Sequence, residues 1–186
     1  MQLAEVVSDI ADSLVAVDNG GVPFRSFHPG VGPYGEPQLV KQVAMLLDSM
    51  PAYSGRISTQ RTPDLLIRDY WAIEVKITRP FGDNGKEAEN WSVNLLHPYR
   101  GNVSSVGDSY KLGELGCSER LAVVVVGYEH SPPLIDLTPL VDSFEAIARY
   151  VVGIRLSDRT ESYRGVLAHP VHQALRVFGW EVISVG

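Results

Sequence analysis

The chain has 186 residues, of which 45% are hydrophobic and 20% charged, and this composition is typical of one folded domain with a substantial core. No apolar run approaches the roughly 20 residues of a transmembrane helix, and the first residues lack the basic start and apolar core of a signal peptide. Cys117 is the single cysteine, so an intramolecular disulfide is excluded. We therefore expect a cytoplasmic protein with one domain over residues 1–186, in which Cys117 packs just past a helix end.

The formal net charge of −6 argues against a nonspecific nucleic-acid binder. The positive charges are nevertheless concentrated, because 8 of the 16 lysines and arginines lie in residues 56–111. If a metal neutralised carboxylates in this segment, the segment would be basic. A local DNA-binding cleft on an acidic protein is therefore compatible with the sequence.

The first third of the chain predicts two helices separated by a loop. Residues 2–17 carry an apolar stripe with helical spacing and are followed by Asn19-Gly20-Gly21, which is typical of a helix end. Residues 19–37 are rich in glycine and proline and predict a loop, either a plain connector or a flap over a groove. Glu36-Pro37 begins the second helix. Glu36 either complements the helix dipole there or supplies an acid to a site.

Residues 62–79 contain two short apolar runs that predict a β-hairpin, preceded by a short strand over Tyr53–Ser58. In the second run Ile73, Val75 and Ile77 alternate with Glu74 and Lys76, so the two ionisable side chains share one strand face. Asp64 begins the first run, which continues through residues 65–67. Two carboxylates beside an ammonium group are suited to holding Mg²⁺ and acting on a phosphodiester.

Convergence of these three side chains depends on the length of the hairpin loop. A two-residue turn at Asp69-Tyr70 would point Asp64 away from Glu74. A three-residue loop over residues 68–70 pairs Asp64 with Glu74 and brings both to one face. A metal site therefore requires the odd loop or a bulge, and Asp69, the rival acid, is expected to be solvated at the turn.

The pattern Pro63-Asp64, nine residues, then Glu74-Val75-Lys76 resembles the PD-(D/E)XK superfamily of nucleases, which includes most restriction endonucleases. The resemblance covers this motif and the order of the surrounding elements. It implies that Asp64 and Glu74, with the backbone carbonyl of Ile73 or Val75, hold Mg²⁺, for which Mn²⁺ can substitute. It further implies that Lys76 positions or deprotonates the attacking water. Glu36 is a candidate for a second metal or for tuning the first.

The long polar segment over residues 79–104 leaves the strand that carries Lys76, so it is expected beside the site. Its candidates for phosphate contacts are Arg79, Lys86, Arg100 and Asn102, while Trp91 and Tyr99 either stack on bases or pack. Ser104 or Ser105 then caps a helix that ends near Gly113 or Gly116. Lys111 on this helix is a further candidate for a phosphate contact, or a surface lysine.

The remaining chain predicts alternating strands and helices. Residues 121–128 are apolar on both faces, which is typical of a central strand covered by helices. A helix follows Thr138-Pro139, with Val151 among its inward residues, and residues 152–156 predict a strand. His169-Pro170-Val171-His172 begins a last helix, and residues 180–185 close as a strand. For His169 and His172, capping or packing is favoured over a metal site, because no third ligand has matching spacing.

These elements predict an α/β fold with a restriction endonuclease-like core, a mixed central β-sheet flanked by helices on both faces. The function expected first is a Mg²⁺-dependent DNA endonuclease most like a type II restriction enzyme, acting as a homodimer. A repair or recombination nuclease resembling a junction resolvase is the second expectation. A non-catalytic DNA-binding or assembly subunit, or a chance motif in an unrelated α/β protein, are the alternatives from other classes.

Overall fold

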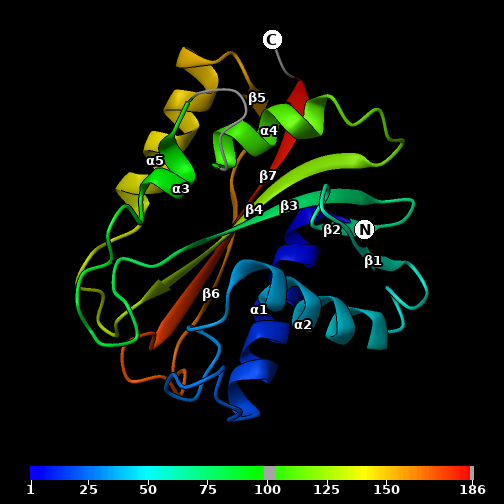
Figure 1. Ribbon diagram of the computed structural model, residues 1–186. Helices are drawn as coiled ribbons and strands as arrows, with labels where there is room; N and C mark the ends of the chain where they lie inside the picture. Colours follow the sequence, from blue (N-terminus) through cyan, green and yellow to red (C-terminus); the bar gives the residue numbers. More distant parts are fainter. Residues whose placement is uncertain (99–103, 185–186) are drawn as a thin grey trace.

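A mixed β-sheet runs through the middle of the molecule in a computed structural model that describes residues 1–98 and 104–184 (Figure 1). The sheet has seven strands among the described residues, in the order β1-β2-β3-β4-β7-β5, with β6 also paired to β7. The strands are β1 (Ile57–Thr59), β2 (Leu65–Ile67), β3 (Trp71–Thr78), β4 (Arg120–Glu129), β5 (Arg155–Leu156), β6 (Thr160–Arg164) and β7 (Ala174–Ser184). The single parallel pair is β3–β4 among these described strands. The α/β class with a mixed sheet is thus confirmed.

Helices cover both faces of the sheet (Figure 1). On one face lie α1 (Leu3–Asn19) and α2 (Glu36–Ser49), and on the other lie α3 (Val93–Leu96), α4 (Ser105–Gly113) and α5 (Thr138–Ala146). Each face has its own buried apolar cluster, because alternate residues of β3 and β4 point to opposite sides. None of the described helices combines the length and apolar character required to cross a membrane.

The central strands are buried on both sides, as residues 121–128 predict. Every residue of β3 is buried, and β4 is buried from Ala122 onward. Val75 and Val124 pack toward α1 and α2, whereas Val123 and Val125 pack toward α4 and α5. Glu74 and Lys76 therefore lie in a buried strand, on its α4 side, where ionisable groups require partners.

The predicted last helix after His169 is wrong. Residues 169–173 form turns, and β7 begins at Ala174, six residues before the predicted closing strand. The imidazole Nδ1 of His169 accepts hydrogen bonds from the backbone N–H groups of Val171 and His172, and this closes a turn instead of a helix. The sequence also gave no indication of β6, whose residues are alternately half-buried and exposed.

Four smaller predictions also need correction. Val151 is 68% exposed, because α5 continues into a π-helical turn, η1 (Ile147–Val151), whose wider spacing rotates this residue outward. The first strand begins at Ile57, and Tyr53 lies in the turn before it. Cys117 is exposed and does not pack in the core. The predicted strand over residues 152–156 is limited to Arg155–Leu156.

Candidate functional site

The β2–β3 hairpin has the odd loop on which the site depends. Ile67 pairs with Trp71 and Leu65 pairs with Ile73, which leaves residues 68–70 as a three-residue loop. Asp69 occupies the left-handed region at φ 69°, a conformation found in three-residue hairpin loops. The side chain of Asp69 is 67% exposed and pairs with Arg56, so its expected solvation is confirmed. The register places Asp64 opposite Glu74.

Asp64 directly precedes β2, at the point where β3 continues past the end of this partner strand. Its Oδ2 accepts a hydrogen bond of 2.9 Å from the backbone N–H of Val75. The N–H and C=O of one residue in a strand point to the same side, so the Val75 carbonyl also faces this open edge. Asp64, Glu74 and the Val75 carbonyl are therefore grouped at one point of the sheet edge, as the sequence predicts.

Glu74 is the most strongly perturbed acid of the group. Its side chain is buried, and its Oε1 atom has no hydrogen-bond partner among the described residues. Burial raises the pKa of Glu74 far above the ordinary range of a glutamic acid, and the nearby negative charge of Asp64 and a hydrogen bond with it raise the pKa further. A cation between the two carboxyl groups would oppose this rise in the pKa of Glu74.

Lys76 lies between two carboxylates from different helices. Its Nζ is 3.0 Å from Glu36 Oε1 at the start of α2 and 2.9 Å from Asp108 Oδ2 in α4. Burial alone would lower the pKa of Lys76, but the charges of Asp108 and Glu36 outweigh it and raise this pKa. The ammonium group is therefore protonated at neutral pH and acts as a cation and hydrogen-bond donor.

Asp108 completes the site and was not among the predicted site residues. It is 1% exposed, lies in the first turn of α4, and also pairs with Lys111 through an Oδ1–Nζ contact of 2.6 Å. Ser104 caps the helix, because its hydroxyl accepts a hydrogen bond from the N–H of Gly107, as the predicted cap requires. The spacing of three residues between Asp108 and Lys111 on one helix could have indicated that this acid is paired with the lysine.

The predicted substrate residues have different surroundings. Arg79 is half-buried and donates a 2.7 Å hydrogen bond to the carbonyl of Gly32 in the loop before α2. Lys111 is partly exposed but is paired with Asp108. Burial raises the pKa of Glu36, although Lys76 opposes this effect. Arg100 and Asn102 lie outside the described residues.

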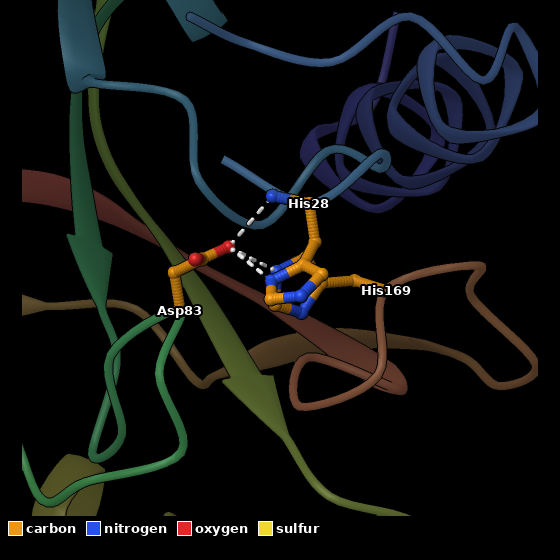
Figure 2. Close-up of side chains that lie close together, drawn as sticks. All are labelled: His28, Asp83 and His169. Carbon is orange, nitrogen blue, oxygen red and sulfur yellow. Dashed lines mark hydrogen bonds and ion pairs between the residues drawn. The ribbon is translucent and has the colours of Figure 1, made fainter. Parts of the chain in front are cut away.

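A second ionisable cluster joins three loops: His28, Asp83 and His169 (Figure 2). Asp83 Oδ1 accepts hydrogen bonds from the backbone N–H of His28 at 3.0 Å, from His28 Nδ1 at 3.1 Å and from His169 Nε2 at 2.9 Å. Partial burial would raise the pKa of Asp83, but these hydrogen bonds outweigh it and lower the pKa to about 2. We refer to these three residues as the histidine–aspartate clamp.

The ligand atoms of the clamp lie within 4.8 Å of one another, a spacing compatible with a metal ion. The hydrogen bonds to His169 argue against this use. Its Nδ1 accepts two backbone N–H groups and so carries no proton, which leaves the proton of the neutral ring on Nε2, the atom that faces Asp83. A metal at Nε2 would need an imidazolate or a rebuilt turn. The predicted capping role of His169 agrees with these contacts.

Comparison with known proteins does not identify this arrangement of residues. No protein-family model, curated protein or solved structure matches the chain. The chemistry of the site is therefore inferred from its own residues.

The group at the sheet edge is suited to binding a divalent cation. It offers two carboxylates and a backbone carbonyl, which are the oxygen ligands that Mg²⁺ prefers. One of these oxygens, Glu74 Oε1, is buried without a partner, and the repulsion between Glu74 and Asp64 would be relieved by a cation. The residues present therefore fit Mg²⁺.

Proposed function

We propose that the protein is a Mg²⁺-dependent DNA endonuclease of the restriction endonuclease-like type. The observation that supports it most is the buried, unpaired Oε1 of Glu74 beside Asp64, two strand positions from the buried Lys76. This arrangement is the one that the PD-(D/E)XK resemblance implies. The odd hairpin loop on which the arrangement depends is present.

In this proposal Asp64, Glu74 and the Val75 carbonyl hold Mg²⁺, and Mn²⁺ can replace it. When bound, the metal would polarise the phosphodiester and lower the pKa of an attacking water. The site needs both carboxyl groups ionised, so binding would release the proton that the metal-free site holds on Glu74.

Lys76 acts as an electrostatic group rather than as a general base. Glu36 and Asp108 keep its ammonium protonated and fixed, so its positive charge can stabilise the negative charge that develops on a phosphate oxygen. Because Glu36 is engaged with Lys76, we assign it the positioning of this lysine in preference to a second metal.

DNA would approach along the β3 edge. Arg79 leaves the end of β3, and Lys111 stands on the other side of Asp108, so both cations border the carboxylate group. Cleavage of both strands commonly requires two active sites, and we therefore propose a homodimer as the active species.

The test is cleavage of a supercoiled plasmid and of short duplexes in Mg²⁺ and in EDTA. We expect Asp64→Asn and Lys76→Ala to lower the cleavage rate by about a hundredfold to a thousandfold, the scale of losing one transition-state electrostatic contact. Asp69→Asn and Lys41→Ala are the matched controls, because Asp69 is the exposed acid of the same hairpin and Lys41 is exposed on α2. Full cleavage by either site variant would overturn the proposal.

The same assay distinguishes a restriction-type endonuclease from a repair or recombination nuclease. A preference for branched or gapped duplexes over plasmid would assign the protein to repair or recombination. Absence of Mg²⁺ and Mn²⁺ binding in calorimetry, together with no cleavage of any of these substrates, would replace the proposal with the non-catalytic DNA-binding or assembly subunit.

A further inference from the structure

A cavity of about 280 Å³ opens directly beyond the site, at the end of β3. Its walls combine aromatic rings with a few polar groups, namely Phe27, Phe81, Trp91, Arg79, Asn94 and Asp83. Ile77 also lines it, and this residue is only two strand positions, or about 7 Å, beyond Val75. The cavity and the carboxylate group therefore lie within one nucleotide of each other along the strand.

The volume of the cavity limits what it can hold. Sites for drug-sized ligands measure roughly 300–1,000 Å³, so this cavity is suited to a single small planar group. Trp91 is half-buried and also packs against the apolar cluster on the α4 side, which fixes its ring at the cavity wall. A flat ring would therefore find a rigid aromatic surface on which to stack.

The polar groups of the cavity are of two kinds. Arg79 forms no ion pair among the described residues and uses one N–H for the Gly32 carbonyl, so several of its five donors remain for a ligand. Asn94 and Glu89 stand exposed in the cavity wall and offer acceptors. Donors beside acceptors match the edge of a nucleobase, which carries ring and carbonyl acceptors together with an amino group.

Two further ionisable groups at the cavity, Asp83 and His172, are held in place by hydrogen bonds. Asp83 belongs to the histidine–aspartate clamp, where three hydrogen bonds reach its Oδ1. His172 donates its Nε2–H to the carbonyl of Phe81, and burial lowers the pKa of His172 to about 4. The cavity wall is thus neutral at His172. The histidine–aspartate clamp holds this wall in place, so the cavity is preformed.

We propose that this cavity binds one unstacked nucleobase of the DNA strand, with the base stacked on Trp91 and its edge contacted by Arg79 and Asn94. Guanine is the base expected to bind best, since arginine pairs with its O6 and N7 and a carboxylate can accept from its amino group. The inference rests on the proposed nuclease function for its substrate class. It adds that the base next to the cleaved phosphate leaves the stack and enters the cavity.

The experiment is calorimetric titration of the protein with dGMP in EDTA, so that no metal takes part. We expect saturable binding that weakens at least about fivefold in Trp91→Ala, the scale of one lost base–aromatic stack. Asn94→Ala should weaken it too, and because Asn94 is exposed this variant should fold normally. Trp91→Phe, which keeps an aromatic ring, and Tyr150→Ala, which removes a ring 85% exposed elsewhere, are the matched controls.

Intrinsic fluorescence gives a second readout, since Trp71 and Trp180 are fully buried and only Trp91 can be quenched by a bound base. Equal binding of deoxyribose 5-phosphate or inorganic phosphate would show an anion site and overturn the inference. Absence of dGMP binding up to millimolar concentration, or unchanged binding by Trp91→Ala, would also overturn it.

The failure of the pocket and the failure of the nuclease are separable. Asp64→Asn should bind dGMP as tightly as the natural sequence, because it leaves the cavity intact. Cleavage without base binding would overturn the proposed base pocket and leave the proposed nuclease function intact. Base binding without any cleavage would overturn the nuclease function and leave the base pocket.

Discussion

The carboxylate site at the β3 edge and the histidine–aspartate clamp contain similar groups but differ in how fully these are paired. In the clamp, the Asp83 oxygen that joins the loops receives three donors, and both histidine nitrogens of His169 are engaged. At the β3 edge, Glu74 leaves one oxygen without a partner and faces a second carboxyl group. A group of metal-binding residue types that lie close together is therefore a weaker indicator of a cation site than a buried carboxyl oxygen that lacks a partner and faces a second carboxyl group.

The largest expected effect concerns the residue that anchors the ammonium group of Lys76. Asp108→Ala would leave the buried ammonium of Lys76 with Glu36 alone, and we expect the free energy of unfolding to fall by about 3 kcal/mol. Urea denaturation followed by circular dichroism measures this free energy of unfolding. Lys111→Ala is the matched control and should cost less than about 1 kcal/mol, since that lysine is 37% exposed. A loss below 1 kcal/mol for Asp108→Ala would mean that Lys76 does not depend on it.

The pH dependence of stability tests whether Glu74 is strained without metal. Its pKa is raised in the folded state above the value of 4.5 for the free group, so the native protein binds a proton that the unfolded chain releases. Stability should therefore be greatest below pH 4.5 for this group and fall as pH rises toward the folded pKa, by at most about 1.4 kcal/mol per pH unit.

Glu74→Gln removes this titration, so in EDTA the variant should lose less stability than the natural sequence between pH 5 and pH 8. The measured quantity is the difference in the free energy of unfolding between the two proteins. The titrations of His172 and Glu36 occur in both proteins, so they cancel in this difference. Parallel stability curves over this range would contradict a raised pKa at Glu74.

Zinc tests the clamp directly. In the double variant Asp64→Asn/Glu74→Gln, where the edge site is removed, about 100 μM Zn²⁺ should change the free energy of unfolding by less than about 0.5 kcal/mol. A site with a Kd of about 1 μM would instead add about 2.7 kcal/mol. A stabilisation of that size that His28→Ala abolishes would make the clamp a metal site.

The sequence was most informative where one local pattern decides the structure. The alternation of Ile73, Val75 and Ile77 with charged residues determined which face Glu74 takes, and the parity of the hairpin loop determined where Asp64 points. The helical stripe of α1 and the Glu36-Pro37 start of α2 likewise needed only nearby residues.

The missed features depend on contacts between distant segments. Asp108 reaches Lys76 only because α4 packs across β3, and nothing near Asp108 in the chain indicates that crossing. β6 has a polar sequence that becomes a strand by pairing with β7. The clamp joins residues 28, 83 and 169, whose loops carry no pattern that relates them (Figure 2).

The smallest expected effect concerns the loop that sets the register. Asp69 adopts a left-handed conformation that glycine accepts more readily, while its ion pair with Arg56 is exposed and weak. Asp69→Gly should therefore change the free energy of unfolding by no more than about 0.5 kcal/mol and leave Mg²⁺ binding intact. Loss of Mg²⁺ binding in calorimetry would show that Asp69, not the register alone, supports the site.

The unequal length of β2 and β3 has a consequence for solubility. β3 runs five residues past its last pairing with β2, and an unpaired apolar edge of this kind can recruit a strand from another molecule. Asp64 blocks the first of these positions by occupying the N–H of Val75, and the charged Lys76 lies in the same stretch. The open edge is thus protected from aggregation by residues of the candidate site. Asp64→Ala should therefore aggregate more readily than Asp64→Asn, whose amide oxygen still accepts that hydrogen bond.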